Sequence, residues 1–409
     1  MDFDAIIVGA GPAGTTAAEA IAREGYDVLV LEEHPQVGIP QHCAGKISVN
    51  ALKELNLPMT GVLQHIRGAR FYSPDMNSLS VERKETQAYI FDRTALDKEL
   101  AKRAVDAGAI LLTSAQATDV SIDPHGVNVL FKHEDRHLRL KARIVIGADG
   151  ASSSIARRLG LYSKERATVR VAIQREVAGL HNVESGFVEV YLGGKYAPGF
   201  FAWIVPTRED SVKAGLCVKP SQGKYLLSYM ENFVKSHPIA KKKLEGGTYT
   251  RQTAHVIPTG GTLHQTVSDG ALIVGDAAGQ VKSATGGGLY YGMVCAKIAG
   301  RVVSKALSSG EDLLRKDVLM EYQRLWRERL GREIEMSIKM RLLLDLLTDD
   351  EVNDLFRIVR EDEALIDLIE AEGDIDWQSK LSVPLLKHVA SALAKRPRLL
   401  LKLGRFMTI

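Results

Sequence analysis

Cysteine is scarce in this sequence: only Cys43, Cys217 and Cys295 occur among its 409 residues. No two of them stand at the spacing of a metal-ligand pair, so we predict no zinc site and no other bound metal. Three scattered thiols are also too few for the four ligands of an iron–sulfur cluster. Their rarity excludes a disulfide framework and favours a reducing compartment.

Long apolar runs and an excess of one charge are also missing. No stretch approaches the roughly 20 apolar residues that a membrane span requires, so any membrane contact would be peripheral. The first residues, MDFDAIIVGAG, contain two aspartates and an apolar run shorter than a signal-peptide core. We therefore expect a cytoplasmic protein, either free or on the cytoplasmic face of the membrane. The 53 basic and 50 acidic residues nearly balance, which argues against nucleic acid as a partner.

The sequence does contain the pattern of a βαβ unit near its start. Ala5 to Val8 is a short apolar run, a glycine loop and a helical segment at Ala17 to Arg23 follow, and Val28 to Leu31 is a second apolar run. Two later runs, RIVIGADG at 143–150 and ALIVGDAAG at 271–279, also look like buried parallel strands. We expect them to join the same sheet, which makes the nucleotide-binding domain discontinuous.

The rest of the chain has two other patterns. Apolar and polar residues alternate over about 168–260, which predicts an antiparallel sheet, and from about 310 onward the periodicity is helical. The predicted class is therefore α/β, with an α+β substrate region. The domains that we expect are a discontinuous Rossmann-like domain for the nucleotide cofactor (1–70, 90–165 and 265–310), a substrate-binding antiparallel sheet (71–89 and 166–264) and a helical C-terminal region (311–409).

The glycine loop has the GxGxxG spacing of dinucleotide-binding proteins. Gly9 permits the tight turn, Gly11 lets a pyrophosphate approach the backbone, and Gly14 allows close packing of the helix. The helix N-terminus then faces the phosphates. Glu32 follows 18 residues after Gly14, at the end of the second strand, where a carboxylate accepts hydrogen bonds from an adenosine ribose.

Downstream motifs favour FAD over a nicotinamide cofactor. The segments GDAAG at 275–279 and ATGGGLYYGM at 284–293 resemble a flavoprotein motif. In that motif an aspartate, here Asp276, binds the ribitol or the pyrophosphate, and a glycine-rich helix start approaches the isoalloxazine ring. Asp149 resembles a companion Asp-Gly motif of aromatic hydroxylases, although the same residue could instead cap the following turn.

Two further segments, GIPQHCAGKIS at 38–48 and YAPGFFAWIVP at 196–206, resemble signature segments of archaeal-type geranylgeranyl reductases, the digeranylgeranylglycerophospholipid reductase-like proteins. That family lies within the p-hydroxybenzoate hydroxylase-type flavoproteins and saturates isoprenoid double bonds. This chain departs from its Tyr-x-Trp-x-Phe-Pro motif in having Phe201 and Val205, so a phenolic hydroxyl is lost. It also has Ser283 where related flavoproteins have proline.

The resemblance implies a set of site residues. The expected FAD contacts are Gly9, Gly11, Ala13, Gly14, Glu32, Glu33, Cys43, Ala44, Gly45, Arg93, Ala117, Asp149, Gly275, Asp276, Gly286, Gly287, Gly288 and Leu289. The expected substrate contacts are Phe200, Phe201, Trp203 and Pro206. Cys43 either donates a proton in catalysis or only lines the flavin site. His42 either assists it or faces solvent, whereas Cys217 and Cys295 are expected as small buried side chains.

We therefore expect an FAD-dependent reductase of the double bonds of geranylgeranyl chains, in membrane lipids or prenyl diphosphates, that acts by hydride transfer from reduced FAD plus a proton. The electron donor stays open between ferredoxin, NAD(P)H and another reductant. The alternatives are an aromatic monooxygenase of the same fold and a non-catalytic prenyl-lipid carrier. The last residues, Trp377 to Ile409, are basic and leucine-rich without an acidic residue, so they either bind anionic lipid or pack on the protein.

Overall fold

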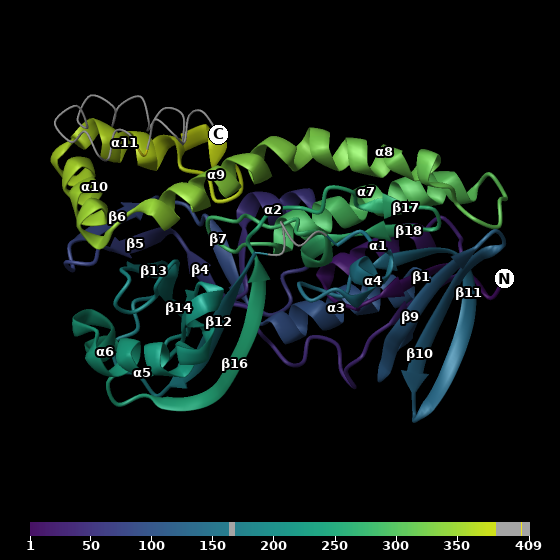
Figure 1. Cartoon of the computed structure of the whole chain (residues 1–409). Coiled ribbons are helices and arrows are strands. Elements are labelled where there is room, and N and C mark those ends of the chain that lie inside the picture. The colour runs from purple at the N-terminus through teal and green to yellow at the C-terminus, as the bar shows by residue number, and fades with distance from the viewer. Residues whose placement is uncertain (163–167, 382–401, 403–409) are drawn as a thin grey trace. The chain divides into compact units, whose positions relative to one another are not determined.

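The computed structural model describes residues 1–162, 168–381 and 402, and its packing divides the chain into two compact units. The first unit comprises residues 1–41, 93–168 and 258–335, and the second comprises 42–92, 169–257 and 336–409. Figure 1 labels many of the elements of both units.

The boundaries of these units differ from those of the expected domains. Residues 42–70 lie in the second unit, residues 258–264 lie in the first, and the C-terminal region 311–409 is divided after residue 335. The division into a cofactor domain and a substrate domain stays a prediction.

The first unit is built on a sheet that has eight strands over the described residues. These are β1 (Phe3–Val8), β2 (Val28–Leu31), β8 (Ile110–Leu112), β9 (Ala115–Asp123), β10 (Gly126–His133), β11 (Arg136–Gly147), β17 (Val267–Ser268) and β18 (Ala271–Ile273). Their order is β17-β18-β11-β1-β2-β8, and β10 pairs with both β11 and β9. β1 runs parallel to β2 and β11, and β18 runs parallel to β11. The βαβ unit and the addition of the two later apolar runs to its sheet are confirmed.

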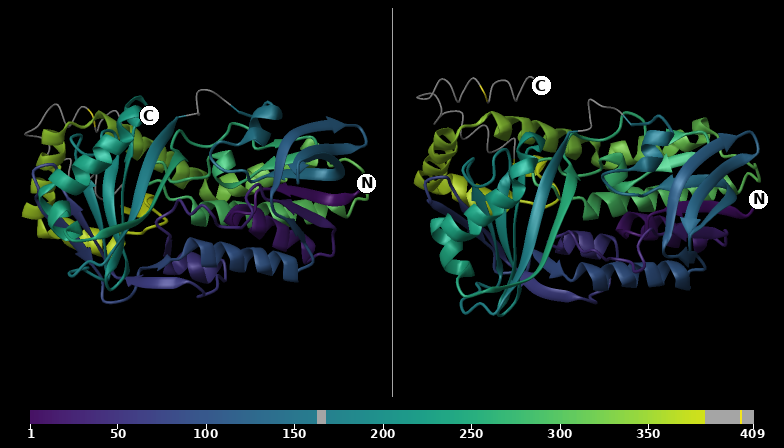
Figure 2. Two further views of the ribbon diagram at one scale, coloured as in Figure 1. Left: turned by 90° about the horizontal axis from the view of Figure 1, so that it is seen from below. Right: turned by 60° about the horizontal axis from the view of Figure 1, so that its bottom comes forward.

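Helices pack on this sheet within the first unit. They are α1 (Pro12–Ala22), α3 (Arg93–Asp106), α4 (Ser154–Arg158), α7 (Leu289–Leu307) and α8 (Lys316–Trp326), with the short 3₁₀ helix η3 (Gly275–Ala278) and the short π-helix η4 (Arg327–Gly331). α1 packs against both α3 and α7. A Cβ atom at Gly300 of α7 would lie 2.4 Å from the Cβ of Ala20, so this glycine permits the close approach of α7 to α1. The long strands β9 and β10, blue in Figure 2, branch from the main strand order, because β10 pairs with the first half of β11 and β9 pairs with β10.

The second unit contains a seven-stranded and a three-stranded sheet in its described part. The larger sheet has the order β16-β12-β15-β14-β13-β5-β6. Its strands are β5 (Gly68–Tyr72), β6 (Ser78–Glu82), β12 (Val169–Ala178), β13 (Phe187–Leu192), β14 (Phe201–Arg208), β15 (Ser211–Val218) and β16 (Thr248–Pro258); the smaller sheet consists of β3 (Lys46–Ser48), β4 (Val62–Ile66) and β7 (Ala88–Phe91). The predicted antiparallel sheet is confirmed, except that β13 runs parallel to β5.

Helices of the second unit include two that we did not expect. α5 (Leu226–Ser236) and α6 (Pro238–Leu244) interrupt the strands of the large sheet; the others are α2 (Val49–Glu54), α9 (Arg332–Leu346, which begins in the first unit), α10 (Asp349–Glu361) and α11 (Glu363–Glu372), with the turn η2 (Pro220–Tyr225). The helical C-terminal region is confirmed up to α11. Among the described residues, no helix is both long and apolar enough to cross a bilayer.

The junction between α5 and α6 is held by a buried histidine. Nδ1 of His237 accepts hydrogen bonds from the backbone N–H groups of Ile239 and Ala240, both at 3.2 Å, and so caps the start of α6. The ring is fully buried. Burial lowers the pKa of His237 to about 4, and the nearby Lys195 adds to this effect. The cap therefore requires the neutral imidazole, because a protonated Nδ1 cannot accept these bonds.

Candidate functional site

The loop between β1 and α1 depends on its glycines in two different ways. Gly9 has φ +103°, and a Cβ there would lie 2.5 Å from the carbonyl oxygen of Ala148. A Cβ at Gly14 would lie 1.9 Å from the carbonyl oxygen of Gly9. Around Gly11, in contrast, no atom of the described residues lies within 4 Å of the position of a Cβ. Gly9 and Gly14 thus serve the fold, while the open side of Gly11 fits the approach of a pyrophosphate.

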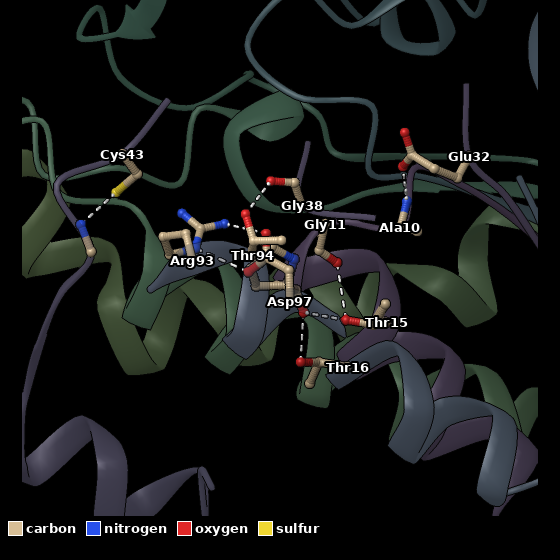
Figure 3. Close-up of polar contacts among 12 residues, drawn as sticks. Ala10, Gly11, Thr15, Thr16, Glu32, Gly38, Cys43, Arg93, Thr94 and Asp97 are labelled. Carbon is tan, nitrogen blue, oxygen red and sulfur yellow. Dashed lines mark hydrogen bonds and ion pairs between the residues drawn. The ribbon is translucent and has the colours of Figure 1, made fainter. Parts of the chain in front are cut away.

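Glu32 directly follows β2, beside this loop. Its Oε2 accepts a hydrogen bond from the backbone N–H of Ala10 at 2.9 Å, as Figure 3 shows. Its Oε1 accepts one from the N–H of His34 at 3.0 Å and lies 2.7 Å from Nδ1 of that ring. A carboxylate has about four lone-pair sites, so the fixed Glu32 keeps capacity for a ribose hydroxyl. The neighbouring Glu33 instead accepts a surface hydrogen bond from Gln116.

The second glycine-rich segment lies against the first loop within the same unit. A Cβ at Gly275, where φ is +66°, would lie 2.9 Å from the Cβ of Ala13. A Cβ at Gly288, just before α7, would lie 2.6 Å from Oδ1 of Asp276. The structure therefore brings together two motifs that are more than 260 residues apart in the sequence. A cofactor that spans both loops fits this arrangement.

The glycines before α7 form a tight turn. The backbone N–H of Gly286, where φ is +74°, donates to the carbonyl of Lys282 at 2.7 Å, and Lys282 in turn pairs with Gly287. Leu289 then begins α7. Ser283 lies inside this turn and is fully buried, and its hydroxyl has no hydrogen-bond partner among the described residues. A buried hydroxyl without a partner is costly, and proline at this position would avoid that cost.

Arg93 and Asp149 are both engaged by protein groups. Arg93 donates from Nε and Nη2 to the two carboxylate oxygens of Asp97, at 2.9 and 2.7 Å (Figure 3). Asp149 accepts bonds from the Ser153 hydroxyl at 2.6 Å and from the backbone N–H groups of Ser154 and Ile155. Asp149 thus caps α4, one of the two alternatives left open. Contacts of either residue, or of Ala117 on β9, with the cofactor stay predictions.

The loop that contains Cys43 belongs to the second unit. The Cys43 thiol accepts a hydrogen bond from the backbone N–H of Gly45 at 3.3 Å (Figure 3). Gly45 has φ +84°, and a Cβ there would lie 2.3 Å from the carbonyl oxygen of Phe91, so only glycine fits. Lys213 of β15 donates from Nζ to the carbonyls of Cys43 at 3.2 Å and Ala44 at 3.5 Å. This half-buried thiol is therefore held in a defined loop.

Sequence reasoning missed Lys213 and left the role of His42 open. Lys213 is 2% exposed. The sequence feature that could have indicated its role is a single lysine within the apolar strand SVKAGLCV. Its hydrogen-bond partners, however, are about 170 residues away in the sequence. His42 was expected either to assist Cys43 or to face solvent. Its ring is half-buried and stacks on His255, with ring centroids 4.6 Å apart, so it does not simply face solvent. Its assistance to Cys43 stays a prediction.

An aromatic cluster lies where β14 begins. Phe200 and Phe201 stack with centroids 4.4 Å apart, and Phe201 meets Trp203 edge to face at 6.1 Å. These three side chains form one apolar cluster with Cys217. We call Phe200, Phe201 and Trp203 the aromatic wall. Pro206 lies on the other face of β14, since alternate residues of a strand point to opposite sides. Its expected contact with substrate stays a prediction.

The two remaining cysteines are buried, as expected. Burial raises the pKa of the Cys217 thiol to about 12 and that of Cys295 well above its ordinary value. Both are therefore neutral small side chains, and Cys43 alone among the three is partly exposed.

Comparisons with known proteins agree with this geometry. A family model described as an FAD binding domain matches residues 2–316. The chain is 36% identical over 363 residues to digeranylgeranylglycerophospholipid reductase 2 of Methanothermobacter thermautotrophicus, which covers 87% of this chain and 91% of the relative. It is 35% identical over 395 residues to an uncharacterized protein of Methanocaldococcus jannaschii, with 97% of each chain covered.

A solved structure has the same fold. A geranylgeranyl bacteriochlorophyll reductase-like protein of Thermoplasma acidophilum matches with a TM-score of 0.85 and 24% identity over 99% of both chains. Together with the two glycine loops and Glu32, these matches give one conclusion. The chain belongs to the family of FAD-binding-domain proteins that includes the digeranylgeranylglycerophospholipid reductases, and FAD is its cofactor.

Proposed function

We propose that this protein reduces carbon–carbon double bonds in the geranylgeranyl chains of archaeal-type membrane lipids. The observation that carries this proposal is the match, over nearly the whole length of both chains, to a protein named for that reaction. Each reduced double bond gains two hydrogens, one as hydride on one carbon and one as a proton on the other. Reduced FAD, when bound, supplies the hydride.

The proton is the part of the reaction that this chain must supply or position. An isolated alkene accepts hydride poorly, so a proton donor close to the double bond lowers the barrier. Cys43 is the candidate. Its sulfur accepts a hydrogen bond from Gly45, which leaves the thiol hydrogen for donation. Lys213 fixes the loop through the carbonyls of Cys43 and Ala44.

The aromatic wall is the candidate surface for the prenyl chain. Phe201 and Trp203 are half-buried apolar rings, the buried Phe200 stacks on Phe201, and the Trp203 indole N–H donates to Gln174 at 3.3 Å. Such a surface binds an isoprenoid by the hydrophobic effect and excludes water from the double bond.

Mass spectrometry of the lipid tests the proposal. The holoprotein is reduced with dithionite under anaerobic conditions and incubated with a digeranylgeranyl glycerophospholipid. We expect products heavier by two hydrogens per reduced bond, and the same protein with oxidised FAD as control should leave the lipid unchanged. An unchanged lipid with demonstrably reduced flavin would refute the proposal. Gain of one oxygen from a phenol, with NADPH and air, would identify an aromatic monooxygenase instead.

We further propose that the reductant binds only transiently. The sequence contains one complete dinucleotide fingerprint, at residues 9–14, so a second nucleotide would lack its own loop. Stopped-flow measurement of flavin bleaching by NADH, NADPH or reduced ferredoxin identifies the donor. Bleaching by none of these three at rates that match turnover would exclude them.

We also propose peripheral membrane contact by the basic segment 377–409. Most of this segment, residues 382–401 and 403–409, lies outside the described residues. Lys402 is described, and its ammonium pairs with the carboxylate of Glu351 at 2.6 Å. That lysine is thus engaged by the protein rather than by lipid. Cosedimentation with anionic vesicles, and not with neutral ones, is the expected result, and equal binding to both would refute an electrostatic contact.

A further inference from the structure

Two buried arginines of the second unit face one carboxylate. Arg170 of β12 and Arg341 of α9 are each 5% exposed. Nη2 of Arg170 lies 2.5 Å from one oxygen of Asp345, and Nη2 of Arg341 lies 2.9 Å from the other. Within the described part of the chain, no other acidic side chain pairs with either arginine, so the trio keeps a net positive charge.

The positive charge of the trio is not balanced by a second carboxylate, and one of its N–H donors also has no hydrogen-bond acceptor among the described residues. The Nε–H of Arg341 is buried, and no acceptor for it lies within the ranges that the structure describes. Burial lowers the pKa of Arg341, and the charge of Arg170 lowers it further, against the opposing effect of Asp345. Buried charges of this kind are costly unless they are paired, so an uncompensated guanidinium at this depth indicates a missing anion.

The arginines lie at one end of the aromatic wall. The guanidinium of Arg341 lies over the ring of Phe200, 5.0 Å from its centroid. Nε of Arg170 donates to the carbonyl of Gly199 at 3.2 Å, next to the same phenylalanine. Asp345 is 30% exposed, so solvent reaches the trio from its side. An apolar surface thus ends at a cationic group that is open to solvent on one side.

We infer that Arg170 and Arg341 bind the phosphate of the prenyl-lipid substrate while its chain lies along the aromatic wall. Guanidinium groups bind phosphate oxygens through paired, charge-assisted hydrogen bonds. Asp345 is the most exposed member of the trio and competes with the phosphate for both arginines. This inference names the polar part of the substrate and rests on the proposed function. A purely structural role, in which the trio fastens α9 to the sheet, makes different predictions.

Binding measured without turnover tests the inference. Oxidised holoprotein is titrated calorimetrically with geranylgeranyl phosphate and, separately, with geranylgeraniol. We expect Arg341→Met to weaken the binding of geranylgeranyl phosphate by roughly 10- to 100-fold, which is the effect of losing a hydrogen-bonded charge. The binding of geranylgeraniol should weaken by less than about threefold. We expect Asp345→Asn to strengthen the binding of geranylgeranyl phosphate by roughly threefold to tenfold, because the substitution removes a negative charge that competes with the phosphate.

Controls separate binding from stability. Arg341→Lys, which keeps the charge, should retain part of the phosphate preference. Arg175 is a second buried arginine of β12 and pairs with Glu231, so Arg175→Met should lower the melting temperature without changing the preference. If Asp345→Asn weakens phosphate binding as Arg341→Met does, or if both variants only lower stability, the trio is structural and the inference is wrong.

The source of the anion and the proposed function are tested separately. Inorganic phosphate should compete with geranylgeranyl phosphate but not with geranylgeraniol, and it should bind much more weakly than the prenyl phosphate because it gains nothing from the wall. Equal affinity of the two phosphates would overturn the assignment to a lipid. If phosphate selectivity holds while reduced holoprotein leaves every lipid unchanged, the proposed reaction fails and the binding site stands.

Discussion

Replacing single glycines in the first loop separates the needs of the fold from those of the cofactor. A methyl group at Gly14 would lie 1.9 Å from the Gly9 carbonyl oxygen, whereas real Cβ contacts essentially never fall below 3.0 Å. The neighbouring atom is backbone and cannot turn aside, so Gly14→Ala must displace α1 from β1. We expect a loss of roughly 3 kcal/mol or more in the free energy of unfolding.

Gly11→Ala should do the opposite. Gly11 has φ −70°, which alanine adopts freely, and no described atom is close to the new methyl. The stability of the apoprotein should stay the same or rise by about 0.4–1 kcal/mol, because the unfolded chain loses freedom. The methyl would instead occupy the proposed pyrophosphate position. FAD affinity should fall by about 10- to 100-fold, the equivalent of one or two charge-assisted hydrogen bonds.

Urea unfolding of the apoproteins and flavin-fluorescence titration measure the two effects. The reasoning is wrong if Gly11→Ala unfolds as readily as Gly14→Ala. It is equally wrong if Gly11→Ala binds FAD as tightly as the unchanged protein.

Four further outcomes are expected. At pH 8 a thiol reagent should modify Cys43 and leave Cys217 unreacted, since the raised pKa of about 12 keeps Cys217 neutral; Cys43→Ser should lower the reduction rate by roughly 10²-fold or more if the thiol is the proton donor. Stability should fall by up to about 3 kcal/mol as the pH drops from 6.5 to 4, because His237 must stay neutral to cap α6. Ser283→Ala should stabilise the apoprotein by roughly 1 kcal/mol.

Two control variants and the contrary outcomes distinguish these explanations from others. Cys217→Ala should leave the thiol labelling unchanged, and modification of all three thiols in the native protein would contradict the burial argument. The sign for His237 follows from its lowered pKa: the unfolded chain binds a proton below about 6.5 that the folded chain refuses, so acid favours unfolding. His237→Asn keeps a capping acceptor without titrating there, and an unflattened pH profile in that variant would assign the effect to other groups. An unchanged or lower stability of apo Ser283→Ala would show that the hydroxyl is satisfied.

Short sequence patterns predicted the first unit well, because its strands and glycine loops are each recognisable from a few neighbouring residues. Buried strands flank GAGPAG, and the later apolar runs end in the same way, so their parallel pairing followed. The closeness of Gly275 to Ala13 was implied only by the resemblance to flavoproteins. It depends on the order of the strands in the sheet, which local patterns do not give. The sequence could not decide whether Asp149 caps α4 or contacts the cofactor. The backbone and hydroxyl donors of the cap lie within six residues of Asp149, so they are present in the sequence whichever role the carboxylate has.

The second unit was harder because its partners are distant in sequence. Lys213 donates to a loop some 170 residues away in the sequence, and no pattern of apolar and polar residues predicts such a contact. α5 was missed although Leu226, Met230 and Phe233 recur at helical spacing, because the alternation in the neighbouring strands was taken to hold over the whole stretch 168–260. The face of Pro206 was predictable from the two-residue period of β14 and was overlooked in favour of the motif.

The order in which the chain visits its two units has a consequence for how such a protein diversifies. The backbone passes between the units after residues 41, 92, 168, 257 and 335, which is five crossings. No single cut in the gene releases either unit as one uninterrupted segment. Neither can therefore be exchanged or duplicated by a single recombination event, so the two units are inherited together.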